Sequence, residues 1–353
     1  MRRGEIGVAL LTVGLIASSG CGGGPDPGRA AWSVRLAGET RLGAASGQGL
    51  VFVVSEQGTL SALSASNGSN VWSVTGLGRP LAGPVAAGPA VCQATVDGHV
   101  HGLSAWTGAR LWTHSPFGPL PMRAEGRFVS FLNALDGHVY GLDAVTGTLK
   151  WDFDPGRGPV TGPVIHSNMV YLVVGRPAGG DSRRLLGLAG DTGELRVEIP
   201  QDEDVSELAV WKGVVYLAHA TGLVWAIEAS TSRLLWRRQT GRVLSTPLVA
   251  RSDGVYYGAR DGWLAALDPA TGEERWGFQA AQEGLSALAL DGGLAYVAEP
   301  RRHWLAVDVA ARAVLWKAPA PTAGRVPPVF ADRWVVWTSP DGWVRAFLKT
   351  PAL

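Results

Sequence analysis

Short hydrophobic runs alternate with turn sequences along most of the chain. In the stretch from 244 to 279, four runs are separated by segments rich in Asp, Gly and Pro: LSTPLVAR (244–251), GVYYGA (254–259), WLAALD (263–268) and ERWGFQ (274–279). Runs of this kind predict β-strands, and the residues between them favour tight turns. Because the runs are too closely spaced for intervening helices, the pattern predicts an all-β fold and argues against a doubly wound α/β fold.

The same four-strand unit recurs through the chain. Its clearest marker is a Trp in the fourth strand, preceded four residues earlier by Gly or a substitute, and successive markers are 40, 40, 39, 46, 39, 40 and 40 residues apart. The marker positions are Trp32, Trp72, Trp112, Trp151, Val197, Trp236, Trp276 and Trp316. A period near 40 residues is typical of a repeat architecture such as a β-propeller, in which each repeat forms one four-stranded blade.

A second repeated position is always small. Four residues after the turn Gly, or the residue that replaces it, the chain carries Ala62, Gly102, Gly141, Gly187, Ala226, Ala266, Ala306 and Ala346. A position restricted to Gly or Ala indicates close approach by a large group. The repeated Trp is the obvious candidate, and its indole could reach this position within its own blade or from a neighbouring blade.

The order of the strands predicts how the ring closes. A fourth-strand segment, residues 30–36, precedes every third strand, whereas the last third strand, residues 343–347, has no fourth strand after it. We therefore expect the N-terminal strand to complete the last blade. The result is an eight-bladed β-propeller of four-stranded antiparallel blades with no open edge in the ring.

The recurring sequence DGWLAALDPATGEERW (261–276), with copies at 97–112 and 136–151, resembles the tryptophan-docking motif of PQQ-type β-propeller repeats. The resemblance extends over residues 30–348. That family includes quinoprotein dehydrogenases and also cofactor-free lipoproteins similar to BamB, an accessory protein of outer-membrane β-barrel assembly. The fold alone therefore does not decide the function.

Two features of the dehydrogenases separate these branches. The dehydrogenases are longer, and they carry a vicinal disulfide together with Glu, Asn and Asp ligands for calcium beside the quinone. This chain has two cysteines, Cys21 and Cys92, which are not adjacent. The resemblance thus implies a non-enzymatic scaffold without a cofactor that binds an envelope protein, with a β-barrel assembly component as the leading case. The alternative is a propeller that holds PQQ or another small molecule and has dehydrogenase-type activity.

Charge and motif content exclude other functions. The chain has 31 Lys and Arg against 30 Asp and Glu, a net charge of +1, and so provides no long-range field for holding nucleic acid. No G-x-S-x-G elbow, phosphate loop or H-E-x-x-H motif occurs in the sequence. We therefore assign no catalytic residue.

The N-terminus has the pattern of an export signal. Arg2 and Arg3 precede an apolar run of 12 residues (6–17), which is too short to span a bilayer, and the small residues 18–20 follow. Cys21 comes next, followed by a Gly-rich segment, and this arrangement resembles the lipobox of bacterial lipoproteins. We expect a signal peptide at 1–20, a tether at 21–29, the propeller at 30–348 and a tail at 349–353.

The lipobox resemblance implies a location. In that family the Cys is lipidated, and residue 22 is Gly rather than the Asp that commonly retains lipoproteins at the inner membrane. We therefore expect a periplasm-facing protein of the outer membrane, held to the membrane by a lipid on Cys21 alone. A secreted form without the lipid is the alternative.

Four residues are candidate partner contacts. BamB-type proteins carry partner-binding side chains after the fourth-strand Trp of a mid-chain blade and in the next blade, and here Arg157 and Asp204 match these in type. The fourth repeat is 46 residues long instead of 40, and the extra residues fall in GRPAGGDSRR (175–184). This insertion is either drift or a partner-specific loop, and it makes Arg183 and Arg184 further candidates.

Three histidines occupy one repeat position, at the start of the third strand: His99, His138 and His303. Equivalent positions in different blades could converge on a metal. However, no Cys, Asp or Glu joins them at ligand spacing, and packing at a blade edge explains them as well, so we assign no metal site. Cys92 lies in the apolar run GPAVCQATV (88–96) and is expected to be a small buried hydrophobe.

Overall fold

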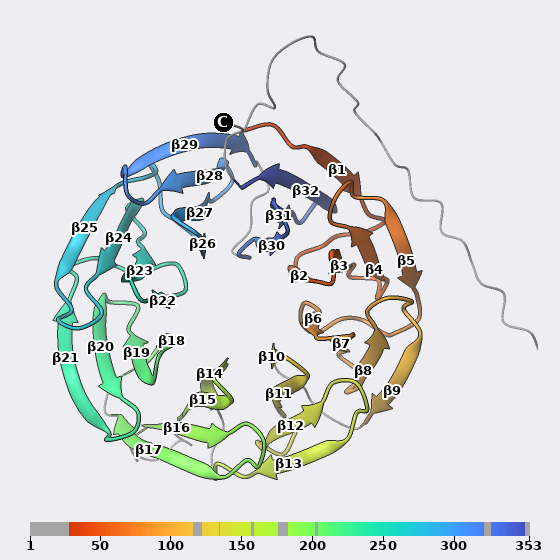
Figure 1. The fold of residues 1–353 in the computed structure, drawn as a ribbon, viewed down its shortest axis with the longest axis horizontal. Coiled ribbons are helices and arrows are strands. Elements are labelled where there is room, and N and C mark those ends of the chain that lie inside the picture. The colour runs from red at the N-terminus through yellow and green to blue at the C-terminus, as the bar shows by residue number, and fades with distance from the viewer. Residues whose placement is uncertain are drawn as a thin grey trace, which may run out of the picture.

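A computed structural model describes residues 28–115, 122–133, 135–156, 159–175, 183–201, 204–320 and 326–349. These residues form eight four-stranded antiparallel sheets arranged as blades around a central axis (Figure 1). Within the described ranges every regular element is a strand. The predicted eight-bladed all-β propeller is confirmed.

Each blade contributes one strand to each of four concentric rings, and blades 1 to 8 are numbered from β2–β5 onward. The innermost strands are β2 (Ala44–Gly47), β6 (Val85–Ala87), β10 (Arg123–Glu125), β14 (Pro159–His166), β18 (Glu207–Trp211), β22 (Val249–Arg251), β26 (Ala287–Asp291) and β30 (Val329–Ala331). The second strands are β3 (Leu50–Val54), β7 (Ala90–Ala94), β11 (Phe128–Leu132), β15 (Met169–Val174), β19 (Val214–Ala218), β23 (Gly254–Gly258), β27 (Leu294–Glu299) and β31 (Trp334–Thr338).

The two outer rings follow the same order. The third strands are β4 (Leu60–Ser64), β8 (Val100–Ser104), β12 (Val139–Asp143), β16 (Arg183–Ala189), β20 (Leu223–Glu228), β24 (Trp263–Leu267), β28 (His303–Asp308) and β32 (Trp343–Leu348). The outermost strands are β5 (Asn70–Val74), β9 (Arg110–His114), β13 (Leu149–Phe153), β17 (Leu195–Gln201), β21 (Arg233–Gln239), β25 (Glu274–Gln279), β29 (Ala313–Pro319) and β1 (Trp32–Arg35).

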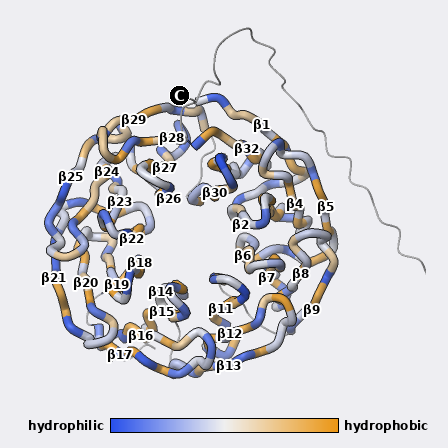
Figure 2. The backbone as a smooth tube through the Cα atoms, viewed as in Figure 1, coloured by the Kyte–Doolittle hydropathy of each residue, from blue (hydrophilic) through white to orange (hydrophobic). Residues whose placement is uncertain are grey.

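The hydrophobic core lies between blades rather than inside one. Alternate side chains of β3 point to opposite neighbours: Val51 and Val53 pack with blade 8, whereas Phe52 and Val54 pack with blade 2. Both faces of a second strand are therefore buried, and all five residues of β3 are inaccessible. This is why these strands are near-continuous hydrophobic runs, which recur as orange stretches in every blade (Figure 2).

The sequence left open whether the repeated Trp contacts its own blade or a neighbouring one. In the structure it contacts both. In its own sheet it is the register partner of the small residue, as in Gly102 with Trp112 and Ala346 with Trp32. A Cβ added to Gly102 would lie 2.1 Å from the Trp112 ring. The indole Nε1 of the same Trp112 donates a hydrogen bond of 2.9 Å to the carbonyl of Ala144 in the next blade.

Five tryptophans dock in this way. Each of their indole N–H groups donates a 2.9 Å hydrogen bond to a backbone carbonyl of the next blade. That carbonyl lies three residues before the Gly of the turn between the third and fourth strands. The pairs are Trp32 with Ala65, Trp72 with Ala105, Trp112 with Ala144, Trp151 with Gly190 and Trp236 with Pro269. Each indole also covers that Gly, with φ between 69° and 74° and ring atoms 2.5 to 2.7 Å from where a Cβ would stand. Docking thus fixes the spacing between blades.

The ring closes as the sequence predicts. β1 pairs antiparallel with β32, with Trp32 opposite Ala346 and Arg35 opposite Trp343, so the first strand of the chain is the outermost strand of the last blade (Figure 1). The chain therefore joins the two ends of the ring by backbone hydrogen bonds rather than by side-chain packing alone.

The structure also bears on predictions for one strand and for Cys92. The first strand predicted for 244–251 is regular only from Val249, preceded by an isolated bridge between Leu244 and Ala259. Cys92 is buried and unpaired, and burial is the main cause that raises the pKa of its thiol to about 12. No helix long and apolar enough to span a bilayer occurs in the described part of the chain.

Candidate functional site

The antiparallel strand order gives the propeller two distinct faces. The links between blades and the turns between second and third strands share one face, which we name the linker face. Backbone hydrogen bonds join these two kinds of loop, as from Val96 to Arg79 and from Leu285 to Ala259. The remaining turns lie on the opposite face, and so do the start of β1 and the end of β32.

Three of the four candidate partner contacts lie on the linker face. Arg183 and Arg184 begin β16, and Asp204 lies in the link from β17 to β18. The Arg183 guanidinium forms an ion pair with the Asp204 carboxylate, so the structure brings together two residues that are 21 positions apart by count. The Asp204 side chain is 86% exposed and that of Arg183 22%, so the pair presents mainly its acidic end.

Arg184 is tied into the same region. Its guanidinium pairs with Glu198 of β17 and donates a 2.8 Å hydrogen bond to the carbonyl of Pro155, in the link between blades 3 and 4. Both arginines therefore brace the loops around blade 4. Arg157 and Cys21 lie outside the described residues.

The three histidines stay in separate local environments. Nδ1 of His99 lies 3.3 Å from Asp97, Nδ1 of His138 lies 3.4 Å from Asp152, and Nδ1 of His303 lies 2.9 Å from Glu299. Each of these carboxylates belongs to the same blade as its histidine. Among the described residues no group of three His, Cys, Asp or Glu side chains is placed to hold a metal ion.

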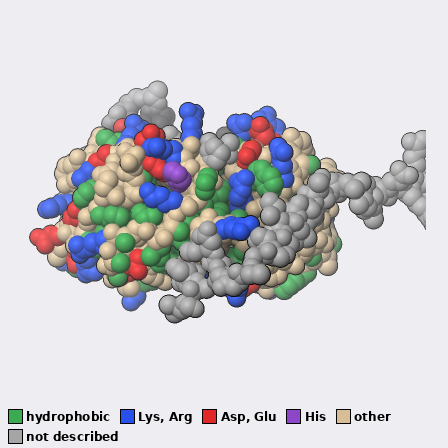
Figure 3. Space-filling model, turned by 90° about the horizontal axis from the view of Figure 1, so that it is seen from above, with side chains coloured by type: hydrophobic (Ala, Val, Ile, Leu, Met, Phe, Trp, Pro, Cys, Tyr) green, Lys and Arg blue, Asp and Glu red, His purple; other side chains and the backbone are tan. Residues whose placement is uncertain are grey.

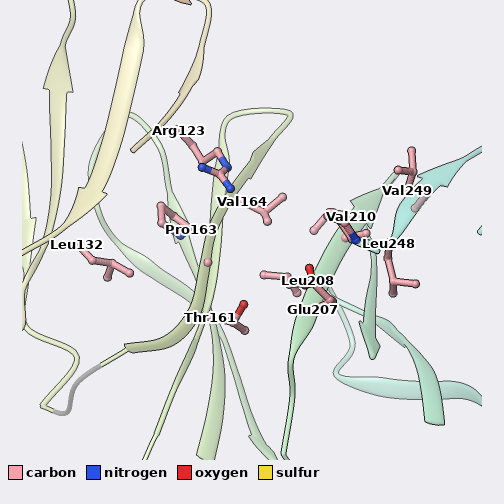
Figure 4. Close-up of a pocket in the computed structure, with 14 residues that line it drawn as sticks. Arg123, Leu132, Thr161, Pro163, Val164, Glu207, Leu208, Val210, Leu248 and Val249 are labelled. Atoms are coloured by element: carbon pink, nitrogen blue, oxygen red, sulfur yellow. The ribbon is translucent and has the colours of Figure 1, made fainter. Parts of the chain in front are cut away.

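A cavity of about 640 Å³ opens in the central channel between the innermost strands of blades 3 to 6. Its wall is largely apolar, with Val164, Leu208, Val210 and Val249 among the lining side chains (Figure 4). Two charged residues, Arg123 of β10 and Glu207 of β18, also line it, and their side chains reach into the space between the strands (Figure 4).

Sequence reasoning missed both charged residues. Strand register gives the residues equivalent to Arg123 as Ala45, Val85, Val164, Ala209, Val249, Ala289 and Val329. Glu207 lies two residues before Ala209, the blade 5 equivalent of Arg123. At the position of Glu207 the other blades carry Gly43, Gly83, Pro121, Gly162, Pro247, Ala287 and Pro327. The first strands vary from three to eight residues and carry no repeated marker residue, so the sequence alone does not set the alignment that shows these two departures from an uncharged pattern.

The surroundings disfavour the charged form of each group. Burial raises the pKa of the Glu207 carboxyl, with a smaller opposing effect from the Arg123 charge. Burial also lowers the pKa of Arg123, again opposed by Glu207. The two groups feel each other's charge but are not within the 4.0 Å of an ion pair.

A second cavity, of about 670 Å³, adjoins the first on the linker face and shares Glu207 with it. Hydroxyl side chains line this second cavity together with Arg260, Arg301 and the acidic Glu283. On the side of the disc drawn in Figure 3, positive and negative side chains are interspersed. That side therefore offers no charged patch that competes with the channel as a candidate site.

Comparison with protein families gives a direct assignment. The chain matches the family described as outer membrane protein assembly factor BamB over residues 24–127, 135–277 and 260–350. The chain belongs to this BamB family. The docking motif predicts PQQ-type repeats, and the family match shows that they are of the BamB-like kind.

Solved structures share the BamB-type fold. BamB from Moraxella catarrhalis superposes with a TM-score of 0.70 at 20% identity, covering 91% of this chain and 97% of that protein. Sqt1 from Saccharomyces cerevisiae gives a TM-score of 0.75 at 11% identity, with 90% and 97% coverage. Identities this low show a common fold and no more, since one propeller frame supports many functions.

An enzyme is also among the relatives. The quinohemoprotein alcohol dehydrogenase of Comamonas testosteroni superposes with a TM-score of 0.69 at 15% identity, covering 92% of this chain and 77% of the enzyme. By sequence it is 30% identical over 82 residues, which span 20% of this chain and 11% of the enzyme. This likeness consists of a shared fold and one short stretch of similar sequence that spans about a tenth of the enzyme.

Proposed function

We propose that this protein is a non-enzymatic scaffold of the cell envelope that binds a protein partner through its linker face, and that the partner is a component of outer-membrane β-barrel assembly. Membership of the BamB family is the main support. The observation in the structure that favours this face is the exposed Asp204 carboxylate held by Arg183 at blade 4, beside the longest repeat.

The proposal includes a lipid anchor on Cys21 and a location at the periplasmic side of the outer membrane. Both rest on the resemblance of residues 1–25 to a lipoprotein signal. With the N-terminal strand entering at the opposite face, an anchored propeller would keep its linker face accessible to a partner.

The test is affinity purification of the full-length, tagged protein from envelope membranes. We expect a β-barrel assembly component to be recovered with the wild type and lost with Arg183→Glu, because this substitution places two like charges together at Asp204. The matched control is Arg196→Glu, since Arg196 is also ion-paired, with Glu194, in the same blade but near the opposite face. Equal recovery with both variants, or no assembly component with the wild type, would contradict the proposal.

A second candidate is a quinone-binding dehydrogenase, which the distant likeness to the Comamonas testosteroni enzyme favours. Incubating the purified protein with PQQ and calcium separates the two candidates. Bound quinone absorbance or dye-linked dehydrogenase activity would support the enzyme and count against the scaffold. We expect neither.

A further inference from the structure

The channel cavity holds two charges of opposite sign whose neighbours do not neutralise them. Arg123 donates one hydrogen bond from Nη1, of 2.9 Å, to the carbonyl of its neighbour Met122, and a guanidinium has five N–H donors. Within the described residues, neither Arg123 nor Glu207 has an ion-pair partner within 4.0 Å. Both therefore have bonding capacity left for a ligand.

The fold itself does not require these charges. At the Arg123 position the other seven blades carry Ala or Val, and at the Glu207 position they carry Gly, Pro or Ala. An eight-bladed ring thus closes with uncharged residues at both places. Charged residues that replace an uncharged pattern in the wall of a cavity are features to expect where function, rather than the fold, requires the residue.

We propose that the cavity between β10, β14, β18 and β22 binds a small zwitterion with an apolar body, of the short-peptide type, with its carboxylate on Arg123 and its ammonium group on Glu207. Arginine suits a carboxylate because its planar N–H groups match the two oxygens. Glu207 supplies the matching acceptor for an ammonium group.

The wall between the two charges suits the body of such a ligand. Arg123 comes from blade 3 and Glu207 from blade 5, so blade 4 and its Val164 lie between them. Leu208, Val210 and Val249 continue this apolar surface (Figure 4). A volume of about 640 Å³ is within the range of small-molecule sites, and it leaves room for side chains of two or three residues.

The probe is the tripeptide Leu-Leu-Leu, titrated into the purified protein by calorimetry. Two matched probes carry the same side chains: the N-acetylated peptide lacks the ammonium charge, and the C-amidated peptide lacks the carboxylate. We expect one site per chain for the free tripeptide. Each blocked peptide should bind about tenfold to a hundredfold more weakly, because one charge-assisted contact is lost.

The variants restore the residues of the other blades. Arg123→Val and Glu207→Ala should each weaken tripeptide binding by a similar factor, and Arg123→Val should no longer distinguish the free from the amidated peptide. Both variants should melt at about the same temperature as the wild type, because the other seven blades carry an uncharged residue at each position and Arg123 is exposed to the channel. The control is Arg35→Val on the exposed outer strand β1, which should leave binding unchanged.

Two results with the tripeptide would contradict a zwitterion site. If Leu-Leu-Leu does not bind at millimolar concentration, or binds equally to wild type and Arg123→Val, the cavity is not a zwitterion site. A fall in melting temperature with both variants would instead assign Arg123 and Glu207 a structural role. None of these outcomes depends on the envelope partner, so this inference and the scaffold proposal fail or stand separately.

Discussion

Each docked Trp decides which residue the next blade tolerates at its third-to-fourth-strand turn. Five indoles cover a turn Gly of the next blade: Gly68, Gly108, Gly147, Gly193 and Gly272. Where Val197 replaces the Trp, the next blade has Ser232 at this turn, with φ 58°. Blade 7 has Arg312 at this turn, with φ 54°, although blade 6 keeps Trp276, so only the turns covered by the five docked rings require Gly.

This relationship predicts the cost of a single methyl group. Gly147→Ala should destabilise the protein because it adds the cost of positive φ, roughly 1–2 kcal/mol, to a collision with the Trp112 ring at 2.5 Å, about 1–3 kcal/mol. Gly126→Ala in the same blade is the control, since its φ is 61° and nothing lies within 4 Å of the added Cβ.

Urea unfolding of the two variants separates the two contributions. The difference between them reports the docked ring alone, since both share the backbone cost. Equal free energies of unfolding would mean that Trp112 moves aside without cost, and that docking does not constrain the turn residue.

We expect the closing strand to matter more for stability than a segment of similar length in the insertion, because it supplies a whole edge of blade 8. Deleting residues 30–36 would remove β1 and leave β32 without its outer partner. We expect a lower melting temperature and more light scattering than after deleting six residues within 175–184, which only restores the usual repeat length. If the loop deletion unfolds the protein while deletion of 30–36 is harmless, closure by β1 contributes nothing to stability.

Third and fourth strands could be predicted from the sequence, whereas first strands could not. The outer strands carry the Trp, the small residue and the turn Gly, so their register follows from one alignment. The innermost strands vary from three to eight residues and pair on one side only, and Pro247, which lacks an N–H, lies just before the regular part of the one predicted over 244–251. Arg123 and Glu207 lie in this ring, and therefore only the register of the structure could show that they replace uncharged residues.

The partner surface was predictable only in part. Arg183 and Asp204 were chosen for separate reasons, one as part of an insertion and the other by resemblance, and the sequence gives no sign that they form an ion pair. Their contact depends on Asp204, which follows β17, lying beside the start of β16. Loop paths of this kind follow from tertiary packing rather than from the repeat.

For the whole molecule, the proposed lipid on Cys21 would set which face of the propeller lies toward the membrane. The start of β1 lies on the face opposite the linker face. Trp32 lies only 11 positions after Cys21, so the tether reaches at most about 40 Å when fully extended. A lipid on Cys21 would therefore keep the propeller close to the membrane, with the candidate contacts at blade 4 on the side away from the point of attachment.

This arrangement predicts the behaviour of two cysteine variants. Cys21→Ser should move the protein from the membrane to the soluble fraction, because serine provides no thiol for the lipid and no other part of the proposal holds the protein to the bilayer. Cys92→Ala is the matched control: Cys92 is buried in blade 2, so its loss should change stability without changing fractionation. The measurement is immunoblotting of membrane and soluble fractions after a carbonate wash. Membrane association that persists in Cys21→Ser would show that the protein is held there by something other than this lipid, and the orientation argued from the tether would lose its basis.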